Sequence, residues 1–334
     1  TDANSAKLIS KDELERDKRW IEGLDKIHRS RNIMKCFDFS ATPFPPGEKT
    51  ISEDMLFGWI VSDFSLNDAI ESGLTKTPRI AIRDDSNKFD ANYRSRFYHI
   101  YRDDDVKPDL NRRAKPHEKL PDLVTNAYWL LGQDWIETRK KWNQRHKETG
   151  LPGSAIPPVM ITVCNKTETA ARIMYTFENG RFDGLKELSD PDFLLHIDST
   201  TMKKAEEGSG DEASNILREK VDTVGKKGKP GEQIRNIVAV DMLSEGWDAR
   251  NVTHIMGLRA FASQLLCEQV VGRGLRRSSY DINDSGLFSE EKVQVFGVPF
   301  TFLPHQGDAG TPPPPEQPTT IIEPDPEKIE HEIS

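Results

Sequence analysis

Two arginines, Arg273 and Arg276, lie three residues apart at the end of an apolar helix-like stretch. Residues three apart on a helix share a face, so both guanidinium groups would point the same way. Paired guanidiniums offer forked N–H donors that match the oxygens of a phosphate group. An exposed basic helix end, favoured by the helix dipole, is the simpler interpretation of such a pair.

The preceding sequence favours the phosphate interpretation. A polar loop at 244–248, SEGWD, lies between apolar runs at 237–240 and 252–258. Unbroken apolar runs are typical of parallel strands covered on both faces, and ligands bind at the carboxyl ends of such strands. Gly246 would let the backbone approach a ligand closely, and the carboxylate of Asp248 can accept hydrogen bonds from ribose hydroxyls.

The loop SEGWD and the later QVVGRGLRR resemble motifs V and VI of superfamily 2 helicases and translocases. The residues of these two motifs are most similar to those of the Res subunit of type III restriction enzymes. The stretch at 36–43, CFDFSATP, resembles motif III, and the resemblance spans about residues 33–298. It implies an α/β fold with a RecA-like parallel sheet flanked by helices, the C-terminal helicase domain. The C-terminal remnant of a first RecA-like domain would precede it.

The resemblance also implies ATP and Mg²⁺ as cofactors, held in a cleft between two domains. Arg273 and Arg276 would stabilise charge that builds on the γ-phosphate, a role worth about 10³–10⁵ in rate. Gln269 would sense the same phosphate. The family's other nucleotide-side positions fall on Gly246 and Asp248 at the ribose, and on Ser40 and Thr42 at the tip of the motif III strand.

Contacts to nucleic acid are implied at further positions. Double-stranded DNA would be bound through its phosphate backbone without base specificity, so a separate modification or recognition subunit is an expected partner. The residues alone leave one position open, because Thr167 or Thr169 can cap a helix as readily as it can contact phosphate. The family's positions fall on Asn165, Lys166, Thr167, Ser199 and Ser244.

The chain lacks the phosphate loop, Gly-x-x-x-x-Gly-Lys-Ser/Thr, that a complete motor of this family needs. The stretch GKKGK at 225–229 has no Ser or Thr after it and predicts a flexible basic loop. We therefore expect the sequence to begin after the magnesium-binding strand, and the 334-residue chain alone to bind nucleotide weakly.

Composition is that of a chain with room for two domains. No apolar run approaches the ~18 residues of a membrane span, and the polar amino end is no signal peptide. Cys36, Cys164 and Cys267 lie in apolar elements without metal-ligand spacing. They predict buried free thiols in a reducing cytoplasm and no metal site.

Charge is concentrated in the tail. From residue 301 the chain carries seven acidic residues and one lysine, a net −6 of the total −9. Four segments follow: 1–75, the end of a first RecA-like domain with a crossover helix; 76–158, a connecting or inserted segment; 159–300, the second RecA-like domain; 301–334, an acidic proline-rich tail.

Periodicity predicts the elements of these segments. A helix at 120–147 is expected to bury Leu123, Ala127, Leu130, Leu131 and Trp135. The charge-rich residues 84–113 predict a surface insertion, and Gly73 would end a helical stretch at 56–74. Further strands are expected at 80–82, 159–164, 193–197 and 292–298, and further helices at 7–28, 167–178, 213–224 and from 263.

Two other function classes remain open from the sequence. The chain can belong to a helicase of another superfamily 2 branch, acting on RNA or in repair, because the motifs do not distinguish DNA from RNA. It can also be a degenerate RecA-like module that binds other proteins, with its acidic tail as a docking segment. An intact ATPase would separate a motor from such a module.

Overall fold

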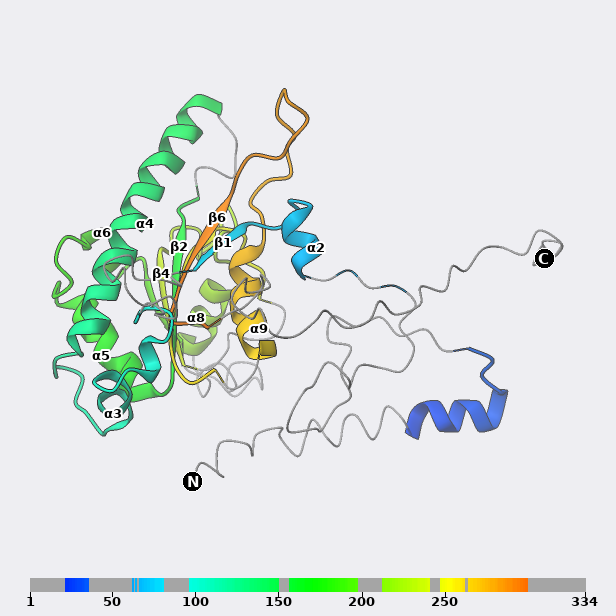
Figure 1. Cartoon of the computed structure of the whole chain (residues 1–334), viewed down its shortest axis with the longest axis horizontal. Coiled ribbons are helices and arrows are strands. Elements are labelled where there is room, and N and C mark those ends of the chain that lie inside the picture. Colours follow the sequence, from blue (N-terminus) through cyan, green and yellow to red (C-terminus); the bar gives the residue numbers. More distant parts are fainter. Residues whose placement is uncertain are drawn as a thin grey trace, which may run out of the picture. The chain divides into compact units, whose positions relative to one another are not determined.

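The computed structural model of the chain describes residues 22–35, 62, 64, 66–80, 96–149, 156–197, 212–240, 247–261 and 264–299 (Figure 1). The chain divides into two compact units, Thr1–Ser65 and Leu66–Ser334. In the first unit residues 22–31 are helical, which agrees with the end of the helix expected at 7–28. The motif III stretch at 36–43 lies outside the described residues, and Cys36, Ser40 and Thr42 with it.

A six-stranded sheet forms the centre of the second unit, with strand order β1-β6-β5-β2-β4-β3. Every neighbouring pair is parallel, which confirms the parallel α/β sheet expected from the unbroken apolar runs. The arrangement is compatible with a RecA-like domain. The strands are β1 (Thr77–Ile80), β2 (Val159–Cys164), β3 (Leu194–Ile197), β4 (Asn236–Val240), β5 (Val252–Leu258) and β6 (Lys292–Phe296).

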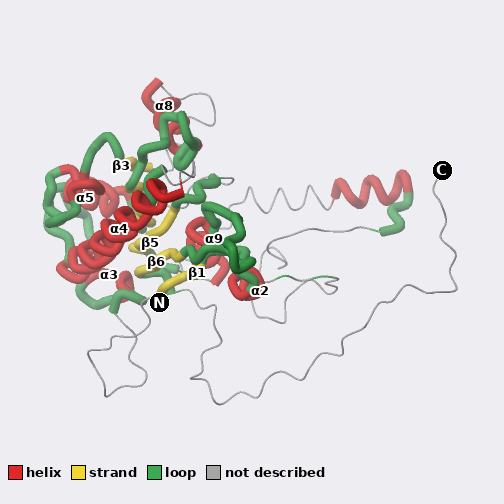
Figure 2. Tube along the Cα trace, turned by 90° about the horizontal axis from the view of Figure 1, so that it is seen from above, coloured by secondary structure: helices red, strands yellow, loops and turns green. Residues whose placement is uncertain are grey.

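Helices cover both faces of the sheet, so the second unit has three layers. Alternate side chains of β2 enter different apolar clusters, because successive residues of a strand point to opposite faces. Ile161 and Val163 pack with helices α8 (Glu212–Asp222) and α9 (Gln264–Leu275). Met160 and Cys164 pack on the other side. That side is covered by α4 (Asp122–Thr149) and α5 (Thr167–Glu178) (Figure 2).

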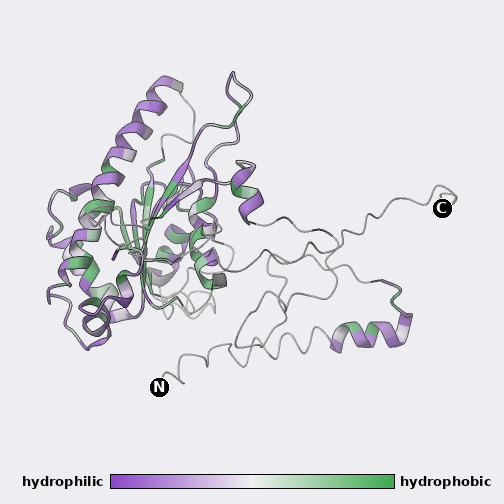
Figure 3. Cartoon of the chain, in the orientation of Figure 1, coloured by the Kyte–Doolittle hydropathy of each residue, from purple (hydrophilic) through white to green (hydrophobic). Residues whose placement is uncertain are grey.

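The long helix α4 buries a stripe that the sequence identified only in part. Ala127, Leu131 and Trp135 are buried as expected, but Leu130 is 41% exposed. Val124 and Tyr128 are buried instead, because they continue the stripe at spacings of four and three residues. The Trp135 indole donates to the Pro158 carbonyl, and Tyr128 shares a hydrogen bond with Thr162. The outer end of α4 is hydrophilic (Figure 3).

The prediction of a surface insertion at 84–113 is wrong for the part that the structure describes. Residues 96–113 contain a short 3₁₀ helix, η2 (Ile100–Arg102), and α3 (Val106–Asn111). The side chains of Ile100, Val106 and Leu110 are fully buried against α4, α5 and the sheet. The charges between them are paired locally, as in the 2.7 Å ion pair of Arg96 with Asp103. Residues 84–95 lie outside the described residues.

Helix α2 (Leu66–Glu71) ends as Gly73 predicted. Gly73 has φ +71°, a conformation that glycine adopts without strain. Its N–H donates to Ile70 and that of Leu74 donates to Ala69, the paired bonds of a Schellman motif. Strand β1 occupies 77–80, and residues 81 and 82 of the strand expected at 80–82 lie outside the described residues.

Two absences hold for the described part of the chain. No helix there is long and apolar enough to cross a bilayer. No group of three or more His, Cys, Asp or Glu side chains there is placed to hold a metal ion. Cys164 and Cys267 are buried free thiols, and burial raises the pKa of Cys267 to about 11.

Candidate functional site

The structure brings the end of α9 together with Trp247 and Asp248. Arg276 directly follows the last residue of the helix. Its Nη1 donates to the Trp247 carbonyl at 2.7 Å and to Oδ1 of Asp248 at 2.9 Å. Nη1 of Arg273 also donates to the Trp247 carbonyl, at 3.4 Å. Both guanidiniums therefore lie beside the loop that precedes β5, as their shared spacing suggested.

Trp247 organises this contact. Its side chain is 4% exposed, and its indole N–H donates to the Val221 carbonyl of α8 at 2.8 Å. The Arg273 guanidinium lies 5.9 Å from the centroid of the Trp247 ring, within the range of a cation–π interaction. The residue thus holds one arginine by its ring and both by its carbonyl. Sequence reasoning missed this role, because a backbone acceptor has no sequence signature.

A packing requirement fixes where α9 lies. A Cβ on Gly274 would come within 2.8 Å of side-chain atoms of Ile255 and Val293, on β5 and β6. Glycine at this position therefore lets the helix approach the sheet closely. The end of the helix is held as well, because the N–H of Lys76 donates to the Leu275 carbonyl at 2.7 Å.

The third arginine of the GRGLRR sequence has a different environment. Arg277 is 4% exposed, and its guanidinium donates to the carbonyls of Ser279 and Ser289. It also lies 3.7 Å from the Glu291 carboxylate and over the ring of Phe288. Arg277 therefore holds the hairpin between α9 and β6 and is not available to a ligand.

Arg276 keeps binding capacity in this arrangement. Its side chain is 41% exposed and that of Asp248 is 51% exposed. All its hydrogen bonds with described residues come from Nη1, so Nε and Nη2 still have N–H groups to offer. A half-exposed ion pair contributes only about 0–1 kcal/mol, so a phosphate group can compete for the guanidinium. The second carboxylate oxygen of Asp248 can accept a hydroxyl.

The other predicted nucleotide-side residues are placed in part. Gln269 is exposed on α9, one turn before Arg273. Ser244 and Gly246 lie within 241–246, which is outside the described residues. Ser199 also lies outside the described residues.

Asn165 and Lys166, predicted to face nucleic acid, bind main-chain carbonyls of the neighbouring α3 in this structure. Lys166 Nζ donates to the carbonyls of Asn111 and Arg112, each at 2.8 Å. Asn165 Nδ2 donates to the Leu110 carbonyl at 3.2 Å. These carbonyls lie at the carboxyl end of α3, where cations and donors are favourable. The two side chains therefore fasten α3 over the end of β2.

The expectation that Thr167 or Thr169 caps α5 is wrong. The capping position is occupied by Lys166, in extended conformation, and no side chain caps the helix. Thr169 donates instead to the Leu110 carbonyl at 3.1 Å, and Thr167 lies 3.4 Å from the Glu168 carboxylate. Thr169 lies inside the helix, two residues after its first residue, so its hydroxyl is not at the capping position and binds α3 instead.

A buried arginine strengthens the same contact and was missed by sequence reasoning. Arg172 is 1% exposed, and its guanidinium forms a 2.8 Å ion pair with Asp109 of α3. It also donates to the carbonyls of Glu118 and Lys119. One guanidinium thus holds three points of the segment 96–121 against α5.

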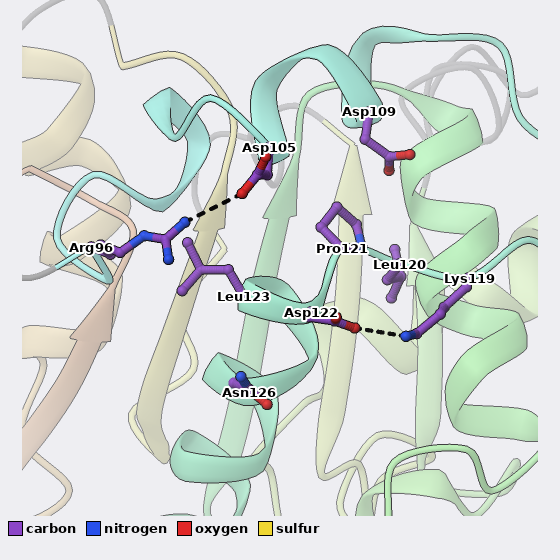
Figure 4. A pocket seen from close by; sticks show the side chains of 9 residues that line it. All are labelled: Arg96, Asp105, Asp109, Lys119, Leu120, Pro121, Asp122, Leu123 and Asn126. Atoms are coloured by element: carbon purple, nitrogen blue, oxygen red, sulfur yellow. Dashed lines mark ion pairs between the residues drawn. The ribbon is translucent and has the colours of Figure 1, made fainter.

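A pocket of about 440 Å³ lies beside this contact, between α3 and the start of α4 (Figure 4). Its charged walls are paired, as in Lys119 with Asp122 at 2.7 Å and Arg96 with Asp105 at 3.6 Å. All its lining residues fall within 96–126, so it is separate from the arginines of α9.

Comparison with known proteins leaves the family undecided: no protein-family model matches this chain and no curated protein sequence matches it. The motifs and the geometry around Trp247 therefore carry the functional argument.

Proposed function

We propose that this chain is the C-terminal motor half of an ATP-dependent DNA helicase or translocase of superfamily 2, most similar to the Res subunit of type III restriction enzymes. The observation that carries the proposal is the cluster at the end of α9. Two arginines converge there on the Trp247 carbonyl, and Asp248 accepts from one of them. The motif wording supports the same assignment.

In the proposed mechanism the arginines act on charge that builds on a phosphate group. The free N–H groups of Arg276 would bind γ-phosphate oxygens, with Arg273 held beside them by Trp247. Because both groups are already positioned, little reorganisation is needed when charge develops. Asp248 would accept from the ribose while still orienting Arg276.

ATP and Mg²⁺ are the cofactors of the proposed reaction. The exposed N–H groups of Arg276 and the second oxygen of Asp248 fit the phosphate and ribose parts of ATP. Magnesium prefers carboxylate and water oxygens, and the residues described in this chain offer no suitable cluster. The phosphate loop and the magnesium acids would come from a first RecA-like domain.

Double-stranded DNA is the proposed nucleic-acid partner, bound through its phosphates. Such contacts carry no sequence information, so a separate recognition subunit would supply specificity. Closing on ATP and opening after hydrolysis would shift these contacts along the duplex.

The test is DNA-stimulated ATP hydrolysis by the protein that joins this chain to its phosphate-loop domain. Arg276→Ala should lower kcat by about 10³-fold or more, the usual contribution of an arginine finger. Arg218→Ala is a matched control, because Arg218 is 40% exposed and lies 3.6 Å from Asp222. Loss of such a surface pair should leave the rate within about twofold.

Wild-type turnover in Arg276→Ala would remove this arginine from catalysis. Absence of ATP hydrolysis in the two-domain wild type would favour the protein-binding module instead. Stimulation by duplex RNA and not by duplex DNA would assign the chain to another branch of the superfamily.

A further inference from the structure

A basic strip covers the loop at which the sequence placed nucleic acid. Residues 112–119, RRAKPHEK, contain four basic residues and one acidic residue. The strip begins where α3 ends, directly over Asn165 and Lys166, whose side chains bind the carbonyls of residues 110–112. The expected contact loop is thus occupied, and the strip forms the outer surface at this end of β2.

The strip is fastened to α5 through its main-chain carbonyls. Arg172 donates to the carbonyls of Glu118 and Lys119. Arg181, beyond the end of α5, donates to the His117 carbonyl at 3.0 Å. Since its carbonyls are the anchored groups, the strip is held along α5 while most of its side chains face solvent.

Its cations exceed its local acids. Arg112 Nη1 pairs with Glu118 at 2.6 Å. The backbone N–H of Lys115 and the Arg112 guanidinium lower the pKa of Glu118, so this carboxylate is already satisfied. Arg113 and Lys115 are exposed and form no ion pair with any residue that the structure describes. The strip therefore presents two uncompensated positive charges on a preformed surface.

A second group of basic residues lies at the outer end of α4, and some of them are paired. Arg139 pairs with Glu187 at 2.6 Å and Lys141 pairs with Glu137 at 2.8 Å. The aspartates at 103–105 precede α3, so acid and base are separated along this segment. A polyanion approaching the end of β2 therefore meets the strip.

We propose that residues 112–119, through Arg113 and Lys115, contact the phosphate backbone of double-stranded DNA in place of Asn165, Lys166 and Thr167. The proposal rests on the proposed function for the choice of DNA as the polyanion. It differs in assigning the contact to residues outside every family motif. Lys166 becomes a positioning residue that holds the strip in place.

The experiment measures binding of the full chain to a short fluorescent DNA duplex by anisotropy, without nucleotide, between about 50 and about 200 mM salt. Arg113→Glu/Lys115→Glu is compared with Lys226→Glu/Lys227→Glu. The control makes the same change in net charge at exposed lysines in the loop before β4, toward the amino ends of the parallel strands, whereas the strip begins over the carboxyl end of β2.

The strip variant should bind about tenfold more weakly or worse. Its slope of log affinity against log salt should fall by about 2, since each lost phosphate contact removes about 0.9. The control should keep the wild-type slope. Equal weakening in both variants, or a wild-type slope in the strip variant, would overturn the proposal.

The hydrolysis assay and the binding assay test the two proposals separately. If the proposed function holds, Arg276→Ala should lose ATP hydrolysis and keep the salt slope of the wild type. A wild-type chain that binds no duplex at low salt would overturn the strip proposal and the choice of DNA, and would leave the arginine mechanism to the hydrolysis assay. Tighter binding to duplex RNA than to duplex DNA would also contradict the proposal.

Discussion

Cations near the two ends of the central sheet differ in how many of their N–H groups are already bonded within the protein. At the start of α5, Lys166 donates to two main-chain carbonyls, and the buried Arg172 donates to two more and to Asp109. At the end of α9, a single nitrogen of Arg276, Nη1, donates all its hydrogen bonds to described residues. Whether a cation is available to a ligand thus depends on the main-chain carbonyls around it and not on the sequence motif in which it lies.

Helix polarity explains the contrast. A lysine at the amino end of α5 is unfavourable for that helix, because the helix end is itself positive. Lys166 is stabilised instead by the carboxyl end of α3, which supplies two carbonyls. Arg276 follows the carboxyl end of its own helix, where a cation is favourable and needs no second element. The first cation joins two elements, and the second can leave for a ligand.

The comparison is tested most strongly by removing one guanidinium from each end. Arg172→Met should lower the free energy of unfolding by about 2–6 kcal/mol, because the two main-chain carbonyls that it binds lose their donor and Asp109 keeps only Arg112 as an ion-pair partner among the described residues. Arg276→Met should cost less than about 1 kcal/mol, since its pair is half exposed. Urea denaturation followed by circular dichroism measures both. Equal costs would remove the distinction between a structural and an available arginine.

Lys76 offers a test of whether burying a cation that binds main-chain carbonyls lowers the stability of the fold. It is 1% exposed and donates to the carbonyls of Arg250 and Val252. Burial lowers the pKa of Lys76 from 10.5 to about 8, while Glu291 opposes the shift. Between these values the unfolded chain binds the proton that the folded chain has lost, so stability rises with pH through this window.

The rise attributable to Lys76 should be at most about 3 kcal/mol, from the size of the pKa shift. Unfolding free energies at pH values from 8 to 10.5 should increase more steeply in the wild type than in Lys76→Met. The difference between the two profiles isolates this lysine from other groups that titrate there. Parallel profiles would show that Lys76 keeps its proton on folding.

The smallest expected effect concerns how the available arginines are held. Trp247→Phe keeps an aromatic ring and the carbonyl but removes the indole N–H. Among described partners the Val221 carbonyl then keeps only its 3.3 Å bond from the Val224 N–H, so the loss should cost about 0.5–1.5 kcal/mol. If the proposed function holds, kcat for ATP hydrolysis should fall about tenfold in this variant, while KM for ATP stays unchanged. Arg218→Ala again serves as the control. A higher KM with normal kcat would assign Trp247 to nucleotide binding and not to positioning.

The sequence predicted the central sheet well for a physical reason. Strands β2, β4 and β5 are covered on both faces, so every residue in them is buried and each gives a mostly apolar run without alternation. The helix α5 followed from the period of its apolar face, and its bounds agree with the prediction.

The segment 96–113 could not be predicted in the same way. Its three fully buried residues are Ile100, Val106 and Leu110. Charged residues lie between them, so the overall composition of the segment predicts a surface loop. One of those charges also has a partner far away in the sequence, since Asp109 pairs with Arg172. The roles of Lys166 and Trp247 were hidden for a related reason, since both depend on main-chain carbonyls brought close only by folding.

The position of β1 has a consequence for how the molecule is made. This strand lies at one edge of the sheet, and β6 is its neighbour, so that Thr77 is paired with Lys292. During synthesis β1 emerges early and waits for the last strand before it can join its ladder. Pairings so distant along the chain close slowly, because the intervening loop must be ordered first. The edge of the sheet is therefore completed only after β6 has left the ribosome.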